Sequence, residues 1–171
     1  GNGNGGKGGS GIHSDNILNI SDNAAITNAT GGSGKNGGNG IHSDGDLTIS
    51  GKAHIVSAIG GGCDSDATNR NAGHGIYSGG MLTISGGTIG TAQGGSGRSG
   101  GYGIRAGMLT ISGEARIDKA TGGDATGSNG TGGTGIYGCD NLIISGGEIQ
   151  QATGGNGNGG KGGSGIHSDN I

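Results

Sequence analysis

The sequence predicts an all-β protein: a right-handed parallel β-solenoid, or β-helix, with about 30 residues and three short strands in each coil. Two observations lead to this prediction. A Gly-Ile pair returns at nearly constant intervals along the chain, and the same order of aliphatic residues follows each complete pair. Self-similarity at a period of roughly 20–50 residues is the sequence signature of a solenoid or array.

The Gly-Ile pair marks the start of each coil. The Ile residues of successive pairs are 29, 35, 28, 32 and 30 residues apart. The whole chain 1–171 is therefore interpreted as one solenoid segment with coils 12–40, 41–75, 76–103, 104–135 and 136–165, and a partial coil 166–171.

Within each coil the pattern reads L-x-I-S, then a turn, then x-I-x-x-A, then a Gly-rich stretch. The alternation in L-T-I-S is that of a strand with Leu and Ile inward and Thr and Ser outward. One coil is too short to bury its apolar face alone, so stacked coils are expected to form continuous aliphatic ladders. The expected core ladder residues are Ile41, Leu47, Ile49, Ile55, Ile76, Leu82, Ile84, Ile89, Ile104, Leu109, Ile111 and Ile117.

A second, longer period accompanies the coils. Residues 155–171 repeat residues 1–17 letter for letter, at an offset of 154 residues. This identity predicts a parent built from tandem 154-residue units of five coils, with self-association from head to tail and laterally into fibres. Uncapped solenoid ends expose strand edges that template further pairing. At about 4.8 Å per coil, one unit should advance roughly 24 Å along the axis.

Composition excludes several other classes of protein. The chain has 51 Gly but no Pro, which rules out collagen, and its apolar residues recur in register, which argues against a disordered linker. The net charge is -3 and Lys and Arg do not cluster, so nucleic acid is not an expected partner. No apolar run approaches the roughly 18 residues of a membrane span, so no membrane insertion is expected.

The Gly-rich stretches, such as GGSGKNGGNG at 31–40, have two possible interpretations. They are flexible surface loops, or their backbones pack closely against one another. Calcium-binding Gly-rich repeats need regularly placed Asp, whereas these stretches mostly carry Asn, Lys and Ser, so neither calcium nor another cofactor is predicted.

The residue after each Gly-Ile pair should point outward and form a column along the axis. Such a column could bind sugar rings or make lateral fibre contacts, or it could be a cross-strand ladder that stabilises its own sheet. His13 and His42 alone do not supply a zinc site, so no metal is predicted. The candidate ligand-binding column consists of His13, His42, Tyr77, Arg105, Tyr137 and His167.

Catalytic residues are not predicted, because the Asp residues at turn-like positions have no accompanying basic set and read as solvated turn carboxylates. The protein is therefore not expected to be an enzyme. Cys63 and Cys139 are separated by more than two coils, which makes an intrachain disulfide improbable. Free thiols or a crosslink between fibres are both left open.

The phrase G-I-x-S-x-x-x-L-T-I-S-G, at residues 40–51 and 75–86, resembles the repeats of Gly-rich right-handed β-helix domains in bacterial cell-surface proteins. Those domains are similar in fold to pectate lyases, and some bind carbohydrate without lyase activity. The resemblance implies a right-handed β-helix and a polysaccharide ligand. The clustered Asp and basic residues around calcium in pectate lyases do not map onto this sequence.

The predicted function is a structural component of an extracellular filament or surface stalk. The alternative is a polysaccharide-binding adhesion module at the cell surface. An ice-binding solenoid, suggested by the outward Thr48, Thr83 and Thr110, and a polysaccharide lyase are remote alternatives. An extracellular or cell-surface location is inferred from the function class, because the sequence carries no export signal that could be read directly.

Overall fold

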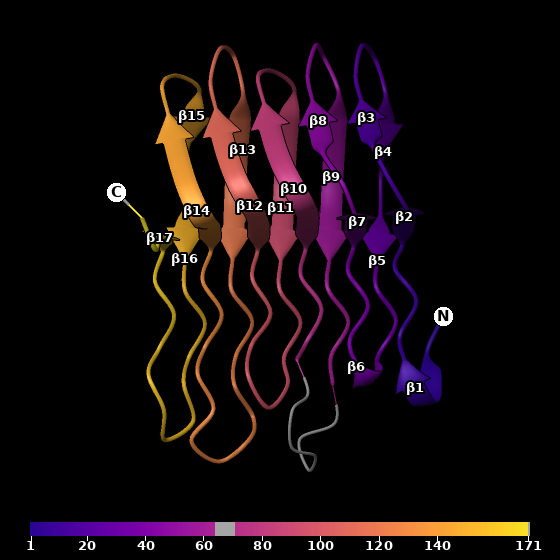
Figure 1. Cartoon of the computed structure of the whole chain (residues 1–171), viewed down its shortest axis with the longest axis vertical. Helices are drawn as coiled ribbons and strands as arrows, with labels where there is room; N and C mark the ends of the chain where they lie inside the picture. The colour runs from indigo at the N-terminus through magenta and orange to yellow at the C-terminus, as the bar shows by residue number, and fades with distance from the viewer. Residues whose placement is uncertain (64–70, 171) are drawn as a thin grey trace.

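The structure is a computed structural model that describes residues 1–63 and 71–170 (Figure 1). Residues 64–70, which belong to the predicted coil 41–75, and Ile171 of the partial coil lie outside the described residues. The described chain forms a parallel β-solenoid of about five turns, as the sequence predicts. Its right-handed sense stays a prediction. Over the described residues there is no helix of the length and hydropathy that a bilayer crossing would need.

Two long parallel sheets run along the axis, and the coils lie side by side in Figure 1. The first, eight-stranded sheet contains β2 (Ile12–Ser14), β3 (Leu18–Ile20), β7 (Ile41–Ser43), β8 (Leu47–Ile49), β10 (Ile76–Ile84), β12 (Ile104–Ile111), β14 (Ile136–Ile144) and β17 (Ile166–Ser168). The second, seven-stranded sheet contains β4 (Ala25–Ile26), β5 (Ala29–Thr30), β9 (His54–Ile59), β11 (Thr88–Gln93), β13 (Arg116–Thr121), β15 (Glu148–Ile149) and β16 (Ala152–Thr153). A small third sheet pairs β1 (Gly3–Lys7) with β6 (Gly34–Asn36).

The strands differ in length between the early and the later coils. In the first two coils the Gly-Ile strand and the L-x-I strand are separate three-residue elements. In the later coils they merge into β10, β12 and β14, which have nine, eight and nine residues. At this point the early coils carry D-N-I and D-G-D, coils 76–103 and 104–135 carry G-G-M and G-M, and coil 136–165 carries C-D-N within the continuous strand β14. Asp and Asn favour turns, but β14 shows that their presence alone does not break the strand.

The aliphatic columns pair in register and form the core between the two long sheets. Leu82, for example, lies opposite Leu47 on one side and Leu109 on the other. All the ladder residues named from the sequence are 0–1% exposed. Ile144 and Ile166, at the C-terminal end of the stack, are 48% and 43% exposed. Each ladder is therefore buried by the coil before and the coil after it.

A tight turn after the first sheet carries the chain to the second sheet. Asp22, Gly51 and Gly113 occupy the same position in this turn, and their φ angles are 57°, 64° and 58°. Left-handed backbone is accessible to Gly and, at some cost, to Asp, so these residue types fit the position.

Apart from the short β1–β6 pair, the described parts of the Gly-rich stretches are neither free loops nor regular sheet. Each stretch consists of an outgoing arm that leaves the second sheet and a return arm that leads to the next Gly-Ile pair, and both arms run extended in Figure 1. Backbone hydrogen bonds of 2.8–2.9 Å alternate between outgoing and return arms along the whole stack. This inter-arm hydrogen-bond chain joins Gly9, Gly32, Gly38, Gly61, Gly73, Gly95, Gly101, Gly123, Gly133, Gly155 and Gly163.

Absence of side chains is what permits this contact between arms. A Cβ added at Gly95 would lie 2.1 Å from the carbonyl oxygen of Gly61, and one at Gly133 would lie 1.9 Å from that of Gly101. Gly95, Gly123 and Gly133 are all buried. Of the two sequence interpretations, the structure shows the close packing of backbones.

Candidate functional site

The predicted outward column lies at the start of the first-sheet strands. Its members pair in parallel register from coil to coil, so their side chains follow one another along the axis. His42 is buried at 7% exposure, Tyr77, Arg105 and Tyr137 are half-buried, and His13 is exposed. Strand pairing thus brings all the predicted column residues together.

Aromatic rings of this column touch at both ends of the stack. The ring centroids are 4.7 Å apart for His13 and His42, 5.0 Å for His42 and Tyr77, and 5.7 Å for Tyr137 and His167. The last pair is stacked with an interplanar angle of 5°. Arg105 interrupts the rings between Tyr77 and Tyr137.

Two residues that the sequence analysis did not select bridge this gap. His74 stacks on Tyr77 at 5.5 Å and contacts Tyr102 at 5.1 Å, and Tyr102 stacks on Tyr137 at 4.8 Å. The result is a continuous series of ring contacts, which we call the ring chain. It consists of His13, His42, Tyr77, His74, Tyr102, Tyr137 and His167.

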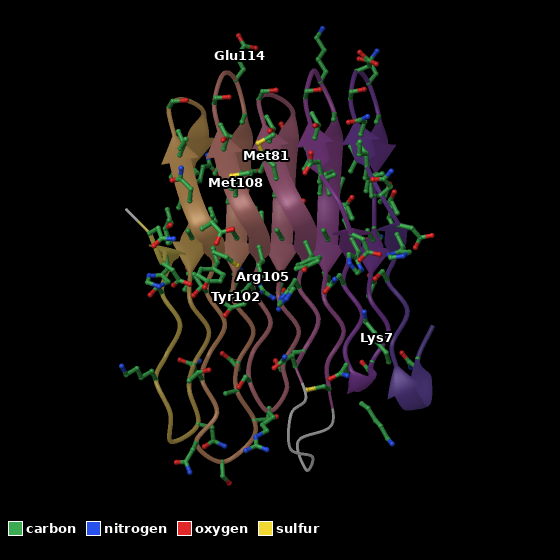
Figure 2. The ribbon with its side chains drawn as sticks, in the orientation of Figure 1. Lys7, Met81, Tyr102, Arg105, Met108 and Glu114 are labelled. Carbon is green, nitrogen blue, oxygen red and sulfur yellow. The ribbon has the colours of Figure 1, made fainter. Side chains whose placement is uncertain are left out.

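Arg105 lies against the middle of the ring chain. Its guanidinium carbon is 5.6 Å from the Tyr77 ring centroid and 5.5 Å from that of Tyr102, which are cation–π distances. Its Nη1 lies 3.4 Å from Nε2 of His74. Figure 2 shows Tyr102 and Arg105 where strand β12 gives way to the Gly-rich arms. The guanidinium therefore replaces a ring in the column without breaking its packing.

A period of three residues on the return arm explains His74 and Tyr102. Each return arm reads x-(G/A)-G-x-G-I-x, so its variable side chains recur at every third residue. The residue before Gly-Ile thus forms a second column beside the predicted one. The sequence carried this signal, but only the residue after Gly-Ile was aligned. The second column consists of Ser10, Asn39, His74, Tyr102, Thr134 and Ser164.

Side chains of the second column also hold neighbouring coils in register. The backbone N–H of His74 donates to Oδ1 of Asn39 at 2.8 Å, and the backbone N–H of Tyr102 donates to Nδ1 of His74 at 3.0 Å. Three residues earlier on the same two return arms, the backbone N–H of Asn71 donates to Oδ1 of Asn36 at 3.2 Å. The corner between sheet and arms is therefore fixed by side chain to backbone bonds.

Three adjoining hollows lie along this corner, and we call them together the axial groove. A hollow of about 440 Å³ is lined by Lys7, Asn36, Asp44, Tyr77 and Arg105, among others. A second, of about 280 Å³, shares His74 and Arg105 with it and extends to Thr131. A third, also about 280 Å³, shares Lys7 and His42 with the first and reaches His13. The groove is mostly polar, and five members of the ring chain line it, namely His13, His42, Tyr77, His74 and Tyr102.

Burial sets the protonation of the ring chain. It lowers the pKa of His74 to about 3, with further lowering by the positive charge of Arg105. Burial also lowers the pKa of His42, although Asp44 acts in the opposite direction. The pKa of Tyr102 is raised by burial, and that of Tyr137 is raised by its hydrogen bond to Asp169. At neutral pH the imidazoles of His42 and His74 and the phenol of Tyr102 are therefore neutral, with the Arg105 guanidinium among them.

This arrangement suits the binding of an extended polar chain. Ring edges, phenol hydroxyls and Asn amides line the groove along the axis, and rings of this kind offer an apolar body with a polar edge. Cys63 and Cys139 are half-buried free thiols in the described structure. Comparisons with protein-family models, with curated proteins and with solved structures find no match to this chain. The structure itself identifies the chain as a parallel β-solenoid.

Proposed function

We propose that this chain is a structural segment of an extracellular filament or surface stalk in which five-coil units follow one another along a single solenoid axis. The observation that carries the proposal is the pairing of β17. This strand has the same sequence as β2, and it lies on β14 in parallel register, with Ile166 opposite Ile136. The first strand of a repeated unit therefore already fits the last coil of the unit before it.

The Gly-rich arms support the same continuation. Gly155 N–H donates to Gly133 O at 2.8 Å, and Gly163 N–H donates to Gly155 O at 2.9 Å, so the inter-arm chain runs into the repeated segment 155–171. The exposed Ile144 and Ile166 present their ladders at this end. Continuation of the repeat would place the counterpart of Ile20 on Ile144 and the counterpart of Ile41 on Ile166, in the order of the other coils.

A mechanical role follows from where the bonds lie. Sheet hydrogen bonds, the aliphatic ladders and the inter-arm chain all connect one coil to the next, parallel to the axis. In solenoids, stability is approximately the sum of the repeats and of their nearest-neighbour interfaces. Length can therefore be added unit by unit without a change in the local structure, which is what a filament or stalk requires.

Chains with one, four and eight tandem 154-residue units test the proposal directly. We expect straight rods in electron micrographs whose length increases by about 24 Å per added unit, with a layer line near 4.8 Å in averaged images. Beads joined by flexible connections, or particles whose length does not scale with unit number, would contradict a continuous stack. A chain with units separated by a polar spacer provides the matched control for such beads.

The axial groove favours a second candidate function, the binding of a polysaccharide at the surface of the filament. The ring chain presents ring edges and hydroxyl groups over several coils, because stacked members cover one another's faces, and Asn36, Asn71 and Thr131 also line the groove. Repetition of the groove in a filament would place many weak sites on one axis, which raises the effective affinity for a long glycan.

Replacement of Tyr102 and Arg105 by Ala in the same chain should weaken glycan binding about tenfold or more, because it removes a ring and the cation from the middle of the groove. Affinity electrophoresis in gels that contain a neutral β-glucan or polygalacturonate measures the effect. Met108→Ala is the control, since Met108 is 48% exposed on the sheet, away from the groove (Figure 2). A wild-type chain that no glycan retards would leave the ring chain as a purely structural ladder.

A further inference from the structure

The tetrapeptide Ile-His-Ser-Asp occurs at the same position of two adjacent coils, at residues 12–15 and 41–44. Strands β2 and β7 pair in parallel, which places His13 beside His42. In the next coils the His and Asp positions of this motif hold Tyr77 and Gly79, and then Arg105 and Gly107. Two imidazoles and two carboxylates therefore meet at one place in the stack.

The donor atoms of this cluster converge. Nε2 of His13 lies 2.8 Å from Oδ1 of Asp15 and 3.9 Å from Oδ2 of Asp44, and Nε2 of His42 lies 3.0 Å from Oδ1 of Asp44. The ligand atoms of His13, His42 and Asp44 all lie within 4.8 Å of one another. A tetrahedral zinc ion with bonds of about 2.0–2.1 Å separates its ligand atoms by roughly 3.3 Å, which falls within this spread.

We propose that His13, Asp15, His42 and Asp44 form a zinc site that ties the first coil to the second. Neutral imidazole suits zinc, and carboxylate oxygens complete a tetrahedral set of two nitrogen and two oxygen ligands. The sequence analysis predicted no metal because it considered the two His alone. The carboxylates were read as turn residues, and only the strand register brings them to the imidazoles.

Ser, the third residue of the motif, explains why the carboxylates turn back toward the rings. The hydroxyl of Ser43 is buried and donates to the carbonyl oxygens of Asn16 at 2.6 Å and Asp46 at 2.9 Å. In the first coil Ser14 donates in the same way to Ile17 at 3.0 Å. These bonds close the turn that follows each short strand, so the Asp side chain stays beside its own His.

Contacts around the site suit a bound cation. Oγ of Ser10 lies 3.4 Å from Nδ1 of His42, a position from which it orients the ring and leaves Nε2 for the metal. Asp15 and Asp44 bring two negative charges to the donor set, which a divalent ion offsets directly. The basic side chains that line the same hollow as His42 and Asp44 are those of Lys7 and Arg105.

The position of the site gives it a structural role. The strands of the first two coils have three residues each in the first sheet, against nine in β10. An ion shared by two coils adds a link where the backbone pairing is shortest. Nε2 of His167 lies 3.1 Å from Oδ1 of Asp169. These residues repeat the half of the site that the first coil supplies, so each 154-residue unit would hold one complete site. This inference does not depend on the filament proposal or on the glycan proposal.

Titration calorimetry of the 171-residue chain with zinc chloride tests the inference. We expect one zinc per chain and a rise in the melting temperature as the ion is added, because the ion binds only the folded chain with full affinity. Asp44→Asn should weaken binding at least about tenfold while it leaves the metal-free melting temperature nearly unchanged, since Asp44 is largely exposed. Asp169→Asn is the matched control, because Asp169 lies in a half site without a second coil, and it should leave both stoichiometry and affinity as in the wild type.

A second measurement guards against folding effects. Cobalt(II) should give the visible absorption of a tetrahedral site in the wild type and in Asp169→Asn, and lose it in His13→Gln. The inference is overturned if the wild type takes up no zinc. It is also overturned if Asp44→Asn and His13→Gln bind as the wild type does, or if Asp169→Asn removes the bound ion.

Discussion

Gly123→Ala is expected to lower the free energy of unfolding by about 3 kcal/mol or more, or to prevent folding. The added Cβ would lie 1.9 Å from the carbonyl oxygen of Gly95 and 2.6 Å from its carbonyl carbon. Both are backbone atoms, which cannot rotate away as a side chain would. Gly123 also donates to Gly101 O at 2.8 Å and accepts from Gly133 N–H at 2.9 Å, so a shift of the arm would break two buried hydrogen bonds.

Gly162→Ala is the matched control for this substitution. It lies in a Gly-rich arm as well, but its added Cβ would meet nothing nearer than Gly155 O at 3.6 Å, an ordinary contact. We expect a change within about 1 kcal/mol, with stabilisation possible because Ala restricts the unfolded chain. Urea unfolding followed by circular dichroism measures both variants. Equal stability of the two would show that the arms do not pack as described.

The Gly residues of the inter-arm hydrogen-bond chain from Gly32 to Gly155 thus belong to the interior of the molecule. In most domains apolar side chains fill the space between backbone layers, whereas here the outgoing and return arms approach until their peptide groups bond directly. Buried backbone donors and acceptors must find partners, and the inter-arm chain provides them. The molecule therefore has two interiors: an aliphatic interior between the two long sheets and a peptide interior between the outgoing and return arms.

Sequence reasoning predicted the aliphatic interior because its apolar side chains recur at fixed positions in every coil. Leu47, Leu82 and Leu109 recur at one position, and strand alternation states which way they point. The Gly residues of the peptide interior also recur in register, as A-x-G-G at the start of each outgoing arm, but this pattern does not state a contact, since a Gly that is needed for packing and a Gly in a flexible loop look alike. What separates the two is the distance to a neighbouring arm, and that distance follows only from the stacked structure.

The candidate site was predicted in part for a similar reason. The residue after Gly-Ile was aligned, and the structure places all of its members along one column. His74 and Tyr102 were missed because only the residue after Gly-Ile was aligned, and the three-residue period of the return arm was not used. Asp15 and Asp44 were assigned to turns, which is where they lie, but their approach to His13 and His42 depends on contacts between two coils.

Ile111→Ala is the second substitution with a large expected effect, a loss of about 2–5 kcal/mol in the free energy of unfolding. Ile111 is 0% exposed and lies in register between Ile84 and Ile144, so its removal leaves a cavity inside a continuous ladder. Ile143→Ala is the control, because Ile143 points outward and is 48% exposed. Its replacement should change stability by no more than about 0.5 kcal/mol in chemical denaturation.

The Ile111 variant also tests how far a defect travels along the stack. Each coil contacts only its neighbours, so the loss should be shared by β10, β12 and β14 and fade toward β2. Amide hydrogen exchange resolves this, since it reports the opening free energy strand by strand. A uniform loss of protection as far as β2 would mean that the solenoid unfolds as one cooperative block. A graded loss would mean that each coil interface contributes separately, and that added units extend the solenoid without changing its local stability.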